Sequence, residues 1–162
     1  MKARIATPLL LVVFLAVLSA PVFAQGTAHI GYQSWGVRAG LSSNPDQVYG
    51  GFHWNLGEFA RNVRFRPSVE FGFGDHVNLV QGNAEVHYVF SKVQVWKPYV
   101  GGSVGVIYAD PDNASSKTDL TLTGIGGVET KLKSATSFFI EGKLGFTNNE
   151  PDFKAGVGWT WK

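Results

Sequence analysis

The segment Phe153-Lys154-Ala155-Gly156-Val157-Gly158-Trp159-Thr160-Trp161-Lys162 alternates strictly between two kinds of residue. One phase is apolar and largely aromatic, and the other consists of glycine, threonine and lysine. Successive side chains of a β-strand point to opposite faces, so this segment is predicted to form a strand with one apolar face.

The same alternation recurs in seven earlier segments. The predicted strands are 35–42, 47–56, 64–74, 79–90, 96–108, 119–132, 137–146 and 153–161. In each of them one phase is free of charged residues, and the connections between them are rich in Gly, Asn, Asp, Pro and Ser. Repeated short strands with turn-forming connections predict an all-β fold.

The opposite phase carries the charged residues, interspersed with small ones. We predict that these side chains form a polar network inside a barrel, with the members Arg38, Arg64, Arg66, Glu70, Glu85, His87, Glu129, Lys131, Glu141, Lys143 and Lys154. Alternation alone does not say which face points inward. A soluble barrel has its apolar face inside, whereas a membrane barrel has it outside, against lipid.

The positions of the aromatic residues favour the membrane arrangement. They gather toward the strand ends as two predicted girdles, which include Trp35, Trp54, Phe65, Phe73, Phe90, Trp96, Tyr108, Phe138 and Phe146. Aromatic girdles of this kind mark the two membrane interfaces of transmembrane barrels. We therefore predict an eight-stranded antiparallel up-and-down transmembrane β-barrel, and a soluble periplasmic ligand-binding barrel is the alternative.

The N-terminus has the pattern of a cleavable signal peptide. Lys2 and Arg4 precede an apolar run from Leu9 to Leu18, and a cleavage site is expected after Ala24. The run is too short for a membrane-spanning helix, which needs about 20 apolar residues. The expected organisation is a signal peptide over 1–24, an N-terminal extension over 25–34 and a barrel over 35–162, exported through the Sec pathway to the outer membrane.

The outward connections would be 42–46, 74–78, 109–118 and 147–152 if the mature N-terminus lies in the periplasm. The longest of them, Ala109–Thr118, is the best candidate for a surface contact. The chain has no cysteine, which excludes a disulfide framework and an acylated-cysteine anchor. Signal removal leaves equal numbers of acidic and basic residues without a basic cluster, which argues against a nucleic-acid partner.

Several stretches together resemble a known family. They are Gly36–Ser42, Phe65–Gly74, Trp96–Gly102 and Pro151–Trp161, and the chain is similar through them to the small outer-membrane β-barrel superfamily of Gram-negative bacteria. The resemblance covers essentially the whole mature chain. It implies a monomer that contacts outer-membrane lipid and lipopolysaccharide, and an assembly signal for the barrel-assembly machinery in the last strand, carried by Phe153, Val157, Trp159 and Trp161.

The resemblance implies architecture rather than activity, because this superfamily includes adhesins, immune-evasion proteins, lipid A enzymes and members without a known role. In one respect the chain departs from the family pattern. Such barrels usually end in an aromatic residue, whereas here Lys162 follows Trp161.

Few residues have the pattern of a catalytic or metal site. The candidates are the Asp75-His76 pair, the inward-phase pair of His87 and Ser103, the isolated His29 and His53, and an incomplete calcium-loop pattern from Asp110 to Asn113. None has the full set of partners that a nucleophile or a metal ion needs, so we expect no cofactor and no metal. The predicted function is that of a non-enzymatic outer-membrane barrel with a side-chain-filled lumen, contributing to envelope structure or surface interactions. The alternatives are a narrow channel for small solutes and a lipid A-modifying enzyme.

Overall fold

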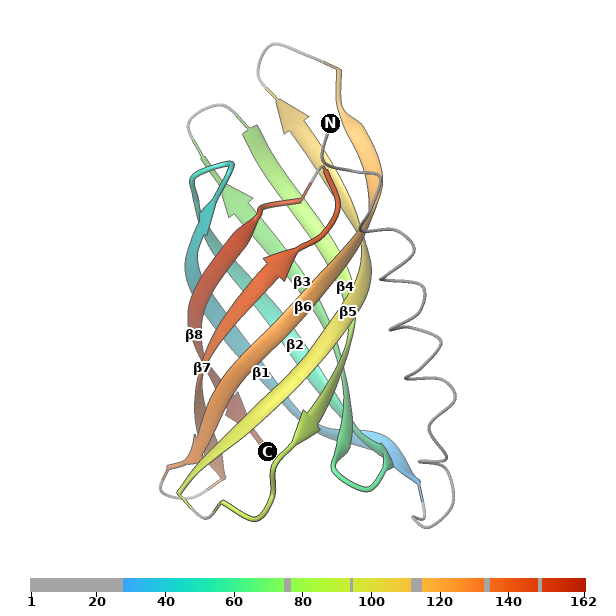
Figure 1. Cartoon of the computed structure of the whole chain (residues 1–162), viewed down its shortest axis with the longest axis vertical. Coiled ribbons are helices and arrows are strands. Elements are labelled where there is room, and N and C mark those ends of the chain that lie inside the picture. Colours follow the sequence, from blue (N-terminus) through green and yellow to red (C-terminus); the bar gives the residue numbers. More distant parts are fainter. Residues whose placement is uncertain (1–27, 75–76, 94, 112–114, 133–134, 149) are drawn as a thin grey trace.

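The chain folds into a closed antiparallel β-barrel in which each strand pairs with the next along the sequence (Figure 1). The structure is a computed structural model and describes residues 28–74, 77–93, 95–111, 115–132, 135–148 and 150–162. The predicted signal peptide lies outside these residues. Among the described residues, no helix is long and apolar enough to cross a membrane.

The barrel has eight strands. Their bounds are β1 His29–Ser43, β2 Gln47–Ala60, β3 Val63–Phe73, β4 Val77–Val89, β5 Trp96–Pro111, β6 Lys117–Lys131, β7 Thr136–Gly145 and β8 Phe153–Trp161. The prediction of an all-β, eight-stranded up-and-down barrel is confirmed. We call the end where β1 begins and β8 ends the terminal rim, and the other end the opposite rim.

Several strands extend beyond their predicted ends. β1 begins at His29 rather than at residue 35, so most of the predicted N-terminal extension belongs to the barrel. β5 runs on to Pro111 and β6 begins at Lys117, which shortens the predicted loop Ala109–Thr118. The reason is that backbone pairing does not depend on the apolar pattern: His29 pairs with Glu58, and Ala109 pairs with Lys117, beyond the alternating segments.

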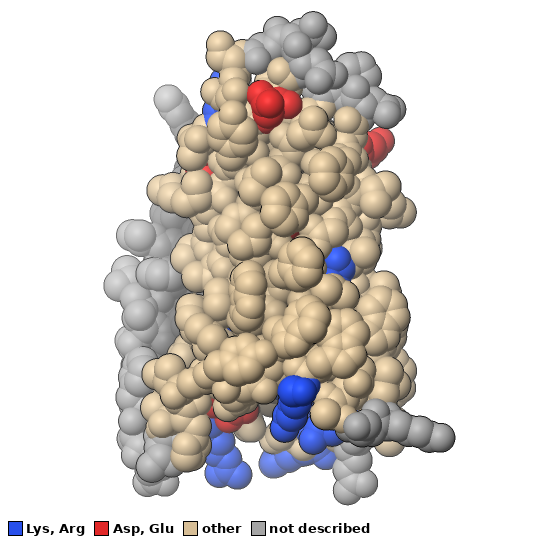
Figure 2. All heavy atoms as spheres, turned by 180° about the vertical axis from the view of Figure 1, so that it is seen from behind, with Lys and Arg blue, Asp and Glu red and all other residues tan. Residues whose placement is uncertain are grey.

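The two faces of the sheet differ in polarity, with the charged phase inside and the apolar phase outside. Leu41 and Leu120 are 65% and 76% exposed, whereas Arg38 and Glu85 are 2% and 0% exposed. Figure 2 shows one side of the barrel, where charged atoms gather mainly near the two ends and a largely uncharged band lies between them. A soluble barrel would show the reverse arrangement, with an apolar interior.

The aromatic residues form contacts along the terminal rim. The ring centroid of Phe138 lies 6.4 Å from that of Trp96 and 5.2 Å from that of Trp159. The ring centroids of Trp35 and Trp161 are 5.2 Å apart. The remaining predicted girdle residues on this rim, Trp54, Phe65 and Phe90, are exposed or half-exposed. The exposed aromatic side chains near the opposite rim include Phe73, Tyr108, Phe146 and Phe153.

Pairing of β1 with β8 closes the barrel, and this seam is directly testable because the protein has no cysteine. Ala39 and Val157 are partners across the seam. The double variant Ala39→Cys, Val157→Cys should form an intramolecular disulfide on mild oxidation, because directly opposed residues bring their Cβ atoms to about 4.5–5.5 Å. The readout is a mobility difference between oxidised and reduced protein on a denaturing gel.

The control is Ala39→Cys with Val104→Cys, which places the second thiol on β5, and this pair should remain reduced. A disulfide in the control, or none in the seam variant, would contradict the closed register.

Candidate functional site

The interior of the barrel holds a cluster of charged side chains centred on Arg38 of β1. Its guanidinium Nη1 donates hydrogen bonds to carboxylate oxygens of three glutamates, with distances of 3.1 Å to Glu70, 2.9 Å to Glu85 and 2.8 Å to Glu141. These glutamates come from β3, β4 and β7. One cation therefore connects four strands through the middle of the barrel.

Three further basic side chains complete this interior charge network. Arg66 bonds Glu85 through Nε at 3.1 Å and Glu141 through Nη2 at 2.8 Å. Lys143 Nζ lies 2.9 Å from Glu85 and also bonds Glu70.

Lys154 of β8 adds a bond of 2.9 Å to Glu70. The network thus contains four basic and three acidic groups, Arg38, Arg66, Lys143, Lys154, Glu70, Glu85 and Glu141, and their side chains are at most 9% exposed.

Neutral polar side chains satisfy the remaining lone pairs of the carboxylates. Ser68 Oγ donates to Glu85 at 2.8 Å, and Tyr99 Oη donates to Glu141 at 2.9 Å. On the side of the opposite rim, Lys154 also donates to Gln81 at 2.6 Å. These additional hydrogen bonds offset part of the cost of burying the charged groups.

An aromatic layer closes the interior between the network and the terminal rim. The guanidinium carbon of Arg66 lies 5.0 Å from the ring centroid of Phe139, and that of Arg38 lies 5.8 Å from it. Tyr99 stacks on His87 with centroids 5.0 Å apart. Val89 and Ile125 pack with Tyr99 and Phe139 as the buried apolar cluster of the barrel.

Inward-phase glycines leave room for these large rings. A Cβ on Gly127 would lie 2.6 Å from Tyr99 Oη, and one on Gly36 would lie 2.5 Å from the imidazole of His53. Real Cβ atoms do not approach other atoms this closely. The small residues of the polar phase are thus the space into which the neighbouring long side chains extend, as the narrow bore of an eight-stranded barrel requires.

The structure separates the predicted polar residues into three groups. Seven of them form the interior charge network, and His87 joins its edge with Nε2 at 3.3 Å from Glu85 Oε2. Arg64 and Glu129 form a separate bidentate pair at 2.7 and 2.9 Å nearer the terminal rim. The prediction was wrong for Lys131, which is exposed at the last position of β6, beyond the depth at which side chains enter the interior.

Sequence reasoning missed several interior residues because they carry no formal charge. Tyr99, Phe139, Gln81 and Asn83 are all buried and all lie on the same phase as the predicted network. The alternation that located the glutamates and arginines could have found them.

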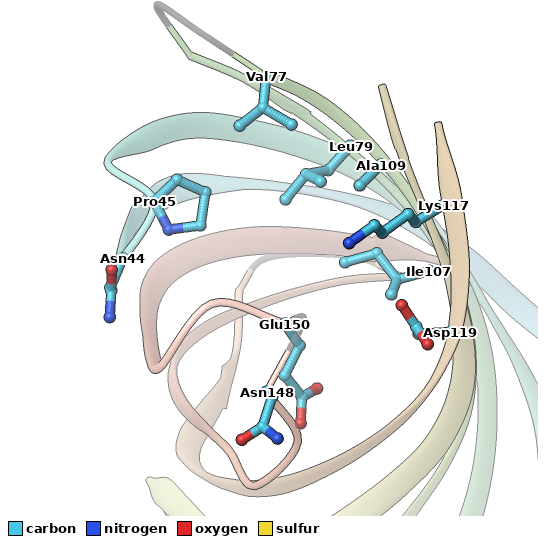
Figure 3. A pocket seen from close by; sticks show the side chains of 10 residues that line it. All are labelled: Asn44, Pro45, Val77, Leu79, Ile107, Ala109, Lys117, Asp119, Asn148 and Glu150. Carbon is cyan, nitrogen blue, oxygen red and sulfur yellow. The ribbon is translucent and has the colours of Figure 1, made fainter. Parts of the chain in front are cut away.

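A small open cavity lies at the opposite rim, between the inner faces of β4, β5 and β6 and two of the connections (Figure 3). Its volume is about 180 Å³, and it is lined by Asn44, Pro45, Val77, Leu79, Ile107, Ala109, Lys117, Asp119, Asn148 and Glu150. Glu150 accepts hydrogen bonds from the backbone N–H groups of Phe146 and Thr147 and from Thr123 Oγ1, at 2.8 to 3.0 Å. This carboxylate anchors the connection between β7 and β8 to the barrel wall.

The residues proposed from sequence as possible catalytic or metal groups have different surroundings. Asp75 and His76 lie outside the described residues, as do Asp112 and Asn113 of the calcium-loop pattern. Asp110 accepts a hydrogen bond of 2.9 Å from Ser116. His53 Nε2 lies 2.9 Å from Thr160 Oγ1, on the terminal-rim side of Arg38. Among the described residues, no three His, Cys, Asp or Glu side chains are grouped so that they could hold a metal ion.

Solved structures resemble this barrel closely in shape but weakly in sequence. Neisserial surface protein A matches with a TM-score of 0.63 and 16% identity, covering 85% of this chain and 99% of that one. The N-terminal β-barrel domain of OprF from Pseudomonas aeruginosa matches with a TM-score of 0.60 and 15% identity, covering 81% and 98%. The chain has the fold of the small outer-membrane β-barrels.

Proteins with this fold differ in what they do. The outer membrane enzyme PagL also matches, with a TM-score of 0.52 and 10% identity over 80% of this chain and 99% of that one. No protein-family profile and no curated protein matches the sequence. At these identities the likeness concerns the small outer-membrane barrel fold and not a particular activity.

The interior charge network predicts an unequal response to removing single carboxylates. Glu85→Gln should lower the free energy of unfolding by about 3–5 kcal/mol, because it leaves Arg38, Arg66 and Lys143 without a shared buried anion. Glu129→Gln breaks only the partly exposed pair with Arg64 and should cost about 1 kcal/mol or less. Urea unfolding of both variants in lipid vesicles measures the difference, and equal losses would show that the network is not the main interior constraint.

Proposed function

We propose that this chain is a non-enzymatic integral outer-membrane barrel whose lumen is closed to solutes and which contributes to envelope structure. In this proposal the signal peptide over 1–24 directs Sec export, and the barrel-assembly machinery inserts the chain as a monomer. The terminal rim lies in the periplasm, and the opposite rim faces lipopolysaccharide and the cell exterior.

The observation that carries this proposal is the interior charge network with the aromatic layer beside it. Ion pairs at hydrogen-bonding distance connect β1, β3, β4, β7 and β8 across the bore. Tyr99 and Phe139, each 1% exposed, lie directly against the network. Passage of a solute would require separating buried charges, which costs several kcal/mol for each unpaired ion.

A non-enzymatic role is supported by the composition of the cavity at the opposite rim. None of its ten lining residues is Ser, His or Cys, so they supply neither the hydroxyl or thiol nucleophile nor the imidazole base of a serine or cysteine hydrolase. The anionic groups that line it include Glu150, whose oxygens already accept backbone and hydroxyl hydrogens. The lumen histidines His53 and His87 are buried on the terminal-rim side of the network and do not line this cavity.

The closed lumen predicts negligible conductance. Purified protein inserted into planar bilayers should give no steady single-channel current. The double variant Arg66→Ser, Phe139→Ala removes one side chain of the charge network and one of the aromatic layer. It should allow measurable current. Heat-modifiable migration on a gel checks that the variant is folded.

Large steady currents from the wild-type protein would refute the closed lumen. If replacing Glu70 by Lys then altered ion selectivity, the protein would be a narrow channel. A changed lipid A mass spectrum in cells that lack the gene would instead favour an enzyme.

The membrane location predicts a depth-dependent cost for charge on the outer face. Val104, near the middle of β5, is 54% exposed, and Val104→Arg should cost about 2–4 kcal/mol in vesicles. Thr118→Arg changes an exposed residue at the start of β6 and should cost about 0–1 kcal/mol. Urea titration of both variants measures these costs, and a negligible cost for Val104→Arg would indicate a soluble barrel.

A further inference from the structure

The two rims of the barrel carry opposite charge. Among the described residues, the basic side chains at the terminal rim are Arg61, Arg64, Lys92, Lys97, Lys131 and Lys162, and the acidic ones are Glu58 and Glu129. At the opposite rim, the described charged residues are Asp46, Asp110, Asp119, Glu150 and Asp152, with one basic residue, Lys117. Figure 2 shows the Lys and Arg atoms concentrated at the lower end of the molecule, which is the terminal rim.

The basic groups of the terminal rim are available to an external anion. Arg61, Lys92, Lys131 and Lys162 are exposed, and none of them forms an ion pair with a described carboxylate. The acidic groups of this rim are already engaged. Glu129 is paired with Arg64, and Glu58 accepts a backbone hydrogen bond from Asn62 at 3.2 Å.

These basic residues adjoin the aromatic girdle. Lys97 directly follows Trp96, and Lys162 directly follows Trp161. Lys131 follows Thr130, which is the cross-strand partner of Trp96. Tryptophan side chains lie at the depth of lipid headgroups, and long basic side chains beside them extend their charge into the headgroup layer.

We propose that the terminal rim is a binding surface for anionic phospholipid headgroups. This inference rests on the proposed membrane location of the barrel. Phospholipid is favoured over a periplasmic polymer or protein because two of the free basic groups, Lys131 and Lys162, lie next to lipid-facing tryptophan positions. Among the described residues, the opposite rim carries mainly acidic side chains and offers these headgroups no comparable set of basic groups.

Tryptophan fluorescence reports on this surface specifically. All five tryptophans, Trp35, Trp54, Trp96, Trp159 and Trp161, lie in the half of the barrel next to the terminal rim. Phosphatidylglycerol and phosphatidylcholine with brominated acyl chains quench tryptophan only when adjacent to it. Two mixtures are compared. In one, brominated phosphatidylglycerol is mixed with ordinary phosphatidylcholine, and in the other the bromine is on phosphatidylcholine. The difference in tryptophan quenching between the mixtures gives the relative binding of the two headgroups at this rim.

The wild-type protein should prefer phosphatidylglycerol severalfold at low salt. About 1 M salt, where the Debye length is about 3 Å, should abolish the preference. The exposed residues at the two ends of β6 provide matched variants. Lys131→Ser should lower the preference by up to about fivefold, the contribution of one basic residue at an anionic surface, whereas Lys117→Ser should leave it unchanged.

The combined variant Arg61→Ser, Lys92→Ser, Lys131→Ser, Lys162→Ser should bind both lipids equally while keeping heat-modifiable migration. Equal quenching by the two lipids in the wild-type protein, or equal effects of Lys131→Ser and Lys117→Ser, would overturn the proposal. If Val104→Arg nevertheless costs about 2–4 kcal/mol, such a result would leave the membrane location intact. The reconstituted assay also does not depend on which rim faces the periplasm in the cell.

Discussion

The hydrogen bonds between the Arg38 guanidinium and three glutamates are the interaction on which the barrel depends most. The apolar cluster inside this barrel is small, so most of the interior is filled by polar groups that hydrogen-bond to one another. Arg38 brings carboxylates from β3, β4 and β7 to one point, and Lys154 extends the same network to β8. The interior therefore fixes the relative positions of strands that are not neighbours in the sheet.

The same constraint explains the glycine-rich polar phase. Long charged side chains can cross a narrow bore only where their neighbours are small, and close approaches such as that between Gly127 and Tyr99 show how little space remains. Charged residues fill the interior and apolar residues cover the exterior, so the charged residues outside the interior network lie at the two rims. Among the described residues, the charges at the terminal rim are mainly basic and those at the opposite rim are mainly acidic.

Most of the fold follows from the sequence because a strict period of two leaves only two choices of face for each strand. The alternation from Phe153 to Trp161 predicted β8 to the residue. Strand ends were less predictable, as at His29, since the backbone ladder continues beyond the alternating pattern. The network members were largely predictable as a set, whereas their pairing was not, because the register across the barrel decides which charges meet. Lys131 shows the limit of the pattern, since its phase is inward but its position is beyond the filled interior.

Spin-label accessibility along β5 tests at once whether the interior is filled and whether the exterior faces lipid. Single cysteines at positions 99 to 108, labelled in vesicles, should give high accessibility to oxygen at even positions such as 104. They should give low accessibility to both oxygen and a water-soluble nickel complex at odd positions such as 103. Odd positions open to the nickel complex would reveal an open channel, and even positions open to it would reveal a soluble barrel.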